Sequence, residues 1–145
     1  MGQVSATSSI DIAATSEQVL AALSDYQTVR PEVLPANYRD YRVESGGTGA
    51  GTVVHWILQA TENRSRDVLA DITVGADSVI ETDRNSTLVT VYRVRPAGSG
   101  TRLETTTSWK GAGGIGGFFE RTFAPKGLAR IQDELLGNVK RRLES

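Results

Sequence analysis

The feature that most limits the possible folds is an alternation of apolar and polar residues between Tyr38 and Lys110. This period of two is typical of β-strands with one buried face, because successive side chains of a strand point to opposite faces. Turns rich in Gly, Pro, Asn and Ser interrupt the pattern at short intervals, which favours consecutive antiparallel hairpins. Strands are predicted near 38–45, 52–60, 66–75, 79–83, 87–95 and 101–110, and an alternating segment at 4–12 adds a seventh.

The segment after the first strand changes to a helical period. Apolar residues recur at helical spacing over 16–26, and Thr15 with Gln18 forms a weak capping box at its start. Pro31 and Pro35 limit the next segment to a short turn of helix. The sequence therefore predicts short helices between the first and second strands.

A long helix is predicted over 125–144, at the end of the chain. Pro125 suits the first turn, where its missing N–H has no partner in any case. An apolar stripe at helical spacing marks one face, formed by Leu128, Ile131, Leu135 and Val139. Gly137 lies within the helix at a cost of roughly 1 kcal/mol relative to Ala. We interpret it as a tolerated surface glycine rather than as a point of close approach.

Composition places these elements in one domain, residues 1–145. The chain has no Cys and a single His, His55, which excludes disulfides, thiol catalysis and a His- or Cys-based metal site. A net charge of −1 provides no basic surface for nucleic acid. No apolar run approaches a membrane span, and the N-terminus lacks a secretory pattern. We therefore expect a cytoplasmic protein without stable membrane insertion, as a monomer or weak dimer.

Polar residues indicate which face of each strand points inward, with His55, Asp67 and Arg93 on outer faces. In the strand at 38–45, Arg39 and Tyr41 are expected inside. Many inward residues are small, namely Ala6, Ser8, Ala60, Ala70, Thr90, Thr105 and Thr107. A seven-stranded sheet is about 33 Å wide, whereas one helix is about 10 Å across. The sheet therefore has to curl around the helix, and the small side chains leave room for a cavity.

Several local motifs occur in the same order as in a known superfamily. They are Ile10-Asp-Ile-Ala-Ala, Ser24-Asp-Tyr, Gly49-Ala-Gly-Thr-Val-Val-His-Trp56, Gly116-Gly-Phe-Phe-Glu-Arg and Pro125-Lys-Gly-Leu. With the order of elements, they make the chain resemble the START-like, helix-grip superfamily, in its polyketide cyclase/dehydrase and lipid-transport (SRPBCC) branch. Birch-allergen-like proteins are more distant relatives. One departure is the segment Val29-Arg-Pro-Glu-Val33, which follows the first helix where this family often has an aromatic residue.

The resemblance implies an α+β fold. In it, a curved seven-stranded antiparallel sheet wraps around the long C-terminal helix, with short helices between strands 1 and 2. It also implies a hydrophobic cavity, because members of the superfamily bind lipids, sterols, polyketides or related apolar molecules. Some members are cyclases or aromatases.

A glycine-rich segment, Gly111-Ala-Gly-Gly-Ile-Gly116, matches the G-x-G-x-x-G pattern of dinucleotide sites. Such a site also needs a second parallel strand and an acidic residue about 20 positions later. Here the chain ends in a helix, so we interpret the segment as a loop at the cavity mouth. We expect no nucleotide, metal or other cofactor.

The preferred function is binding of a hydrophobic small molecule between the sheet and the C-terminal helix. The residues expected to line the cavity are Trp56, Leu58, Ile72, Tyr92, Trp109, Phe119, Phe123, Ile131, Leu135 and Tyr41. One alternative is an enzyme of the cyclase, aromatase or dehydratase type that uses neither metal nor nucleotide. The other alternative is a module that binds a protein partner.

The candidates for catalysis are Tyr92 and Arg39, which are expected on the inner face, and Glu81. Tyr and Arg side chains titrate far above neutral pH, so neither is poised for proton transfer without strong perturbation. Glu81 is expected outside, but a one-residue slip of the short strand 79–83 would turn it inward. An inward Glu81 within reach of Tyr92 or Arg39 favours the enzyme, whereas an outward Glu81 favours a carrier.

Overall fold

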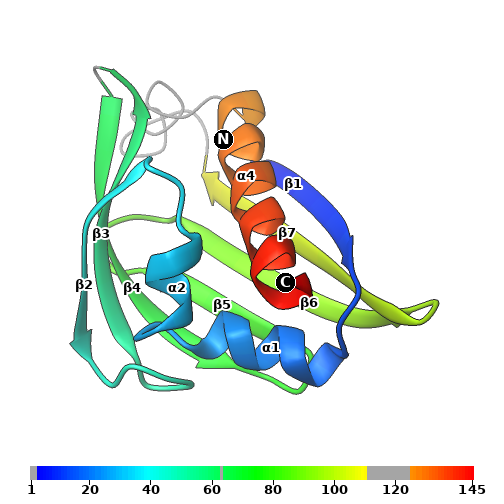
Figure 1. Cartoon of the computed structure of the whole chain (residues 1–145). Coiled ribbons are helices and arrows are strands. Elements are labelled where there is room, and N and C mark those ends of the chain that lie inside the picture. The colour runs from blue at the N-terminus through cyan, green and yellow to red at the C-terminus, as the bar shows by residue number, and fades with distance from the viewer. Residues whose placement is uncertain (1–2, 63, 111–124) are drawn as a thin grey trace.

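Seven strands form one curved antiparallel sheet in the order β1-β7-β6-β5-β4-β3-β2 (Figure 1). The computed structural model describes residues 3–62, 64–110 and 125–145. The strands are β1 (Gln3–Ile12), β2 (Tyr38–Ser45), β3 (Val53–Thr61), β4 (Arg64–Val74), β5 (Ser78–Asp83), β6 (Val89–Ala97) and β7 (Gly100–Lys110). Strands β2 to β7 pair with their neighbours in sequence, and β1 joins the sheet beside β7. The predicted antiparallel sheet is confirmed.

The described helices are α1 (Ser16–Ser24), α2 (Val29–Val33) and α4 (Pro125–Glu144). At the start of α1, the Thr15 hydroxyl accepts a hydrogen bond from the Gln18 backbone N–H at 3.0 Å. The Gln18 side chain accepts one from the Thr15 N–H at 2.9 Å. This is the predicted capping box, which satisfies two backbone donors that a helix start leaves free. The predicted C-terminal helix has the expected bounds.

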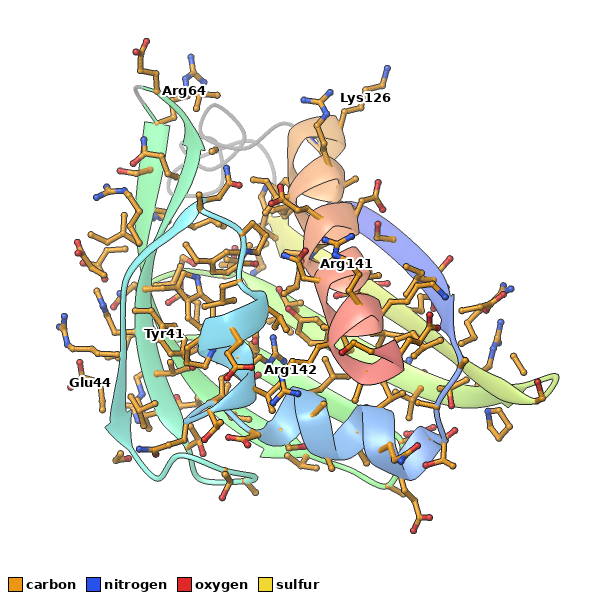
Figure 2. The ribbon with its side chains drawn as sticks, viewed as in Figure 1. Tyr41, Glu44, Arg64, Lys126, Arg141 and Arg142 are labelled. Carbon is orange, nitrogen blue, oxygen red and sulfur yellow. The ribbon has the colours of Figure 1, made fainter. Side chains whose placement is uncertain are left out.

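All of these helices lie on the concave side of the sheet (Figure 1). The buried side of α4 consists of Leu128, Ile131, Gln132, Leu135, Leu136 and Val139. An Arg142–Glu32 ion pair at 2.6 Å and a hydrogen bond from Asn138 Nδ2 to the Val33 carbonyl at 2.9 Å join α4 to α2. Side chains of the sheet, α2 and α4 meet in the interior that these elements enclose, with Tyr41 on the β2 side (Figure 2). The helix-grip arrangement is therefore confirmed.

A bulge in β2 corrects one sequence prediction. Asp40 has a left-handed φ of 52°, and the pairing with β3 shifts between Arg39 and Arg42. The extra residue reverses the alternation, so Tyr38 and Tyr41 both face inward. Arg39 points outward instead, with its side chain 47% exposed and its Nε donating to Gln59 Oε1 at 3.0 Å. The prediction of Arg39 as an inward cation is wrong.

His55 lies on the outer face of β3 as predicted, but it is not exposed to solvent. Its exposed fraction is 7%. Nδ1 lies 3.0 Å from the Asp40 carbonyl oxygen, and Nε2 lies 3.0 Å from Asp67 Oδ1. The bulged β2 strand and a carboxylate of β4 therefore occupy both ring nitrogens. His55 is therefore on the predicted outer face, but these neighbours cover it, so the expectation of a solvent-exposed side chain is wrong.

We predict that Gly100→Ala destabilises the protein by roughly 2 kcal/mol or more. A Cβ at Gly100 would lie 2.3 Å from the Ile12 carbonyl oxygen, where the start of β7 approaches the end of β1. The contact is with backbone, so one strand would have to shift. Urea unfolding measures the change, and a loss below about 0.5 kcal/mol would contradict this close approach.

For Gly137→Ala we predict the opposite sign, a gain of about 0.5–1 kcal/mol in the free energy of unfolding. Among the described residues, a Cβ there would meet Arg141 Nη1 at 3.8 Å, which is ordinary van der Waals contact. The substitution then acts mainly by reducing the backbone freedom of the unfolded chain. Urea unfolding beside Gly100→Ala provides a matched comparison. A destabilised Gly137→Ala variant would indicate the close approach that the sequence left open.

Candidate functional site

A band of polar side chains crosses the concave face of the sheet. In one row, Glu81 of β5 pairs with Thr90 of β6, which pairs with Thr107 of β7. In the next row, Tyr92 pairs with Thr105, which pairs with Ser8 of β1. Directly opposed residues of antiparallel strands have Cβ atoms about 5 Å apart, so these side chains are neighbours. We call these six residues the polar band.

One end of the band is a cluster around the buried cation Arg30 of α2, which is 1% exposed. Arg30 Nη1 lies 3.4 Å from Glu81 Oε2, and Nη2 donates to the Tyr26 hydroxyl at 2.9 Å. Tyr26 donates to the same Glu81 oxygen at 2.7 Å, and Arg30 Nε donates to the Leu23 carbonyl at 2.8 Å. We call Arg30, Glu81, Tyr26 and Tyr92 the arginine cluster. It joins the segment after α1 to the centre of the sheet.

Aromatic rings complete this cluster. The Arg30 guanidinium carbon lies 4.4 Å from the ring centroids of both Tyr26 and Tyr92. Rings at this distance attract a cation, and they do so more strongly where water is excluded. Arg30 and Glu81 therefore face each other within an aromatic enclosure.

The electrostatic effects on the two charged groups differ. Burial raises the pKa of Glu81, and Arg30 and the Tyr26 hydrogen bond oppose this shift only in part. Burial alone would lower the pKa of Arg30, but Tyr26, Tyr92 and Glu81 outweigh it and hold this pKa above its ordinary value. Burial also raises the pKa of Tyr92. The guanidinium thus stays charged, while Glu81 holds a proton more readily than an exposed carboxyl does.

The other end of the band meets α4. The Thr90 and Thr107 hydroxyls are 2.8 Å apart, and Gln132 Nε2 of α4 donates to Thr107 Oγ1. One position further along α4, Asp133 accepts a hydrogen bond from Ser8 Oγ. Within the part of the chain that the structure describes, Thr105 Oγ1 and Gln132 Oε1 are buried without a hydrogen-bond partner. Such atoms are rare in native proteins, because each carries an uncompensated desolvation cost.

An aromatic wall forms the β2–β3 side of the interior. The Trp56 ring lies 5.5 Å from Tyr38 and 6.4 Å from Tyr41, measured between ring centroids. Trp56 is 4% exposed, and its indole Nε1 has no hydrogen-bond partner among the described residues. The wall therefore offers a flat apolar surface together with one buried donor.

Most residues predicted to line a cavity lie in one buried core. These are Trp56, Leu58, Ile72, Tyr92, Trp109, Ile131 and Leu135, and the half-buried Tyr41 packs against them. Glu81 points inward, and Arg30 contacts both Glu81 and Tyr92. The inward direction is the one that the enzyme alternative requires, but the contacts of Glu81 are with Arg30 and Tyr26, and Arg39 lies on the outer face. The predicted lining residues Phe119 and Phe123, like the segment 111–116, lie outside the described residues.

Sequence reasoning missed three residues of the site. Arg30 lies in the segment Val29–Val33, where the sequence shows only a departure from the family pattern, and Tyr26 lies four positions before it, in the turn between α1 and α2. Gln132 follows Leu128 by four positions and thus shares its face of the helix. A polar residue on that apolar stripe was the available signal for Gln132.

Two hollows of a few hundred Å³ lie away from the polar band, at the surface of the described part of the chain. One, of about 420 Å³, is on the outer face and is lined by Arg42, Glu44, Val53, His55, Asp67, Leu69, Arg84 and Asn85. Its charged groups pair locally, for example Arg42 with Glu44 and His55 with Asp67. The other, of about 250 Å³, lies beside the end of β1 and the β6–β7 turn. Neither contains an unpartnered buried polar atom among the residues described.

The described residues contain no group of three or more His, Cys, Asp or Glu side chains placed to hold a metal ion. Among the same residues, no helix has both the length and the apolar composition that a membrane span requires.

Comparison with known proteins places the chain in a family. Residues 3–144 match the sequence profile described as polyketide cyclase/dehydrase and lipid transport. The solution structure of KanY protein (ms6282) is 56% identical, with a TM-score of 0.92 and coverage of 100% of both chains. No curated protein matches the chain.

More distant structures share the fold. A START superfamily protein from Mycobacterium smegmatis is 14% identical, with a TM-score of 0.68 and coverage of 98% of this chain and 97% of that one. Norcoclaurine synthase from Thalictrum flavum is also 14% identical, with a TM-score of 0.67 and coverage of 99% and 98%. Members of this superfamily bind hydrophobic ligands or act as polyketide cyclases. With its curved sheet, its gripped helix and a profile match over nearly its whole length, the chain belongs to the polyketide cyclase/dehydrase and lipid transport family.

Proposed function

We propose that this protein binds a hydrophobic small molecule in the interior between the concave face of the sheet and α4. Three buried polar atoms without a described partner carry the proposal: Trp56 Nε1, Thr105 Oγ1 and Gln132 Oε1. A core built only for stability would pair such atoms or replace them with apolar groups. They come from β3, β7 and α4, on three sides of one interior. The aromatic wall and membership of the family support an apolar ligand.

A second candidate function is acid–base catalysis on that ligand, which Glu81 favours. A buried carboxyl with a raised pKa is suited to proton transfer near neutral pH. Two contacts of Glu81, those with Tyr26 and Arg30, use the same oxygen, Oε2, and tie the carboxyl to the fold. Ligand binding is the step that a carrier and a cyclase share, so it comes first in the proposal. The distant structures show the fold alone and do not separate the two functions.

We predict that the protein binds N-phenyl-1-naphthylamine saturably, and that Ala70→Leu weakens this binding at least about tenfold. Ala70 is buried on the inner face of β4, opposite Val54. A larger side chain there would occupy space that the probe needs. Overpacking a filled core costs roughly 1–3 kcal/mol. If the interior has room for a ligand, Ala70→Leu should lower the free energy of unfolding by less than this amount. Probe fluorescence and urea unfolding measure the two effects.

Thr73→Leu, on the same strand but exposed, is the matched control and should bind the probe as the wild type does. Absence of saturable binding by the wild type would refute the proposal. Equal affinity for the Ala70→Leu variant would also refute this position of the site. A module that binds only protein partners would give the first of these results.

For Glu81 we predict a pH-dependent contribution to stability that Glu81→Gln removes. Because burial raises the pKa of Glu81, the folded chain holds this proton above the ordinary value of 4.5. The stability due to Glu81 is therefore fully present below that value and is lost as pH rises through the folded pKa. Across this range, the stability of wild type relative to Glu81→Gln should fall by up to about 1.4 kcal/mol per pH unit.

Urea unfolding between pH 4 and pH 8 measures this difference, and Glu104→Gln, at an exposed position of β7, supplies the reference profile. Parallel profiles for wild type and Glu81→Gln would show that Glu81 holds no proton above its ordinary range. Catalysis would then lose its support, and ligand binding would remain.

A further inference from the structure

We infer that the ligand carries a neutral hydroxyl or keto group, held by the Thr105 hydroxyl and the Gln132 side-chain amide. This inference rests on the proposed function and specifies the chemical class of the ligand. The proposed anchor lies at the α4 end of the polar band, and the apolar body of the ligand extends from it toward the aromatic wall.

The register of the sheet brings the two anchor residues together. Thr105 lies between Tyr92 and Ser8 in its row, and Ser8 donates to Asp133 of α4. Two residues further along the same face of β7, Thr107 accepts a hydrogen bond from Gln132. The turn of α4 at 132–133 therefore contacts both neighbours of Thr105. Thr105 and Gln132 are 0% and 2% exposed, so both polar atoms are enclosed.

The free hydrogen-bonding capacity of this pair suits an oxygen group. Gln132 Oε1 is an acceptor, and the Thr105 hydroxyl both donates and accepts. A ligand hydroxyl satisfies both by donating to Gln132 and accepting from Thr105. A keto oxygen accepts from Thr105 but cannot donate to Gln132 Oε1, so in this orientation of the amide a hydroxyl matches the pair better. If the amide of Gln132 were turned by 180°, its free end would be a donor, and a neutral oxygen group would still be the matching partner.

Charge argues against an ionised head group. Arg30 is the only buried Lys or Arg among the described residues. Its guanidinium already contacts Glu81, Tyr26 and the Leu23 carbonyl. Among the described residues, no buried cation is therefore left to pair with a ligand carboxylate in the interior. Burying a carboxylate without such a partner is costly. A neutral oxygen group avoids this cost.

The stability of a Thr105→Val variant separates a ligand contact from a structural one. Removing a buried hydroxyl that has no partner should leave the melting temperature unchanged or raise it. Thr107→Val should lower the melting temperature, because Thr107 bonds to both Thr90 and Gln132. If Thr105→Val lowers the melting temperature as much as Thr107→Val does, the Thr105 hydroxyl has a structural partner and the inference is wrong.

Binding is tested with three probes that share one ring system: naphthalene, 2-naphthol and 2-naphthoate. Calorimetric titration of the whole chain should show that 2-naphthol binds about tenfold more tightly than naphthalene, and 2-naphthoate more weakly than 2-naphthol. Thr105→Val should reduce the tenfold preference for 2-naphthol over naphthalene to less than about threefold. Gln132→Met should have the same effect.

Thr106→Val is the matched control, because Thr106 neighbours Thr105 but faces outward, where its hydroxyl lies 3.4 Å from that of Thr7. It should retain the full preference. Equal binding of naphthalene and 2-naphthol, or a preference that survives Thr105→Val, would overturn the inference and leave the proposed function standing. Tightest binding of 2-naphthoate would overturn it in favour of a charged ligand. Failure of all three probes and of N-phenyl-1-naphthylamine would refute the proposed function itself.

Discussion

The concave face of the sheet is about three times as wide as the helix that lies on it, at the usual spacing of strands and diameter of a helix. Two features of the chain cover the part of the sheet that α4 leaves open. The sheet curls, so that β2 and β3 lie across the interior from α4 (Figure 1). The segment containing α1 and α2 covers another part of the face. The polar band runs between these coverings, so the interior follows from the mismatch between one sheet and one long helix.

The position of α2 depends on Arg30. A guanidinium buried without partners would cost several kcal/mol, so this side chain is stable only where Glu81, Tyr26 and Tyr92 surround it. Its contacts reach the Leu23 carbonyl at the end of α1 as well as β5 and β6. A five-residue helix has little stability of its own. We infer that the arginine cluster specifies where this helix docks on the sheet, because a buried charge is stable only where its partners are correctly placed.

Local patterns predicted the elements better than they predicted the site. Alternation identified all seven strands because each has one buried face, and the capping box located the start of α1. The bulge at Asp40 shows in the sequence only as a spacing of three between Tyr38 and Tyr41, and regular alternation back from Tyr41 placed Arg39 on the inner face. It therefore reversed the expected direction of Arg39. The sequence named Glu81 as a catalytic candidate but left its direction open, because an acidic residue is assigned outward unless a distant partner is known. That partner, Arg30, is 51 positions away, which follows from their residue numbers.

The interior contains two kinds of buried polar group, and they imply different roles. The polar groups of the arginine cluster contact one another and the Leu23 carbonyl, so folding alone can account for them. Thr105 Oγ1 and Gln132 Oε1 have no such contacts among the described residues, so stability does not account for them. Two strand spacings, about 10 Å, separate Glu81 on β5 from the residues of β7. A ligand anchored at Thr105 would therefore need a body of roughly that length to reach Glu81. A fused-ring molecule of that length would bring its far end to Glu81, whereas a shorter ligand would be bound without contact with the carboxyl.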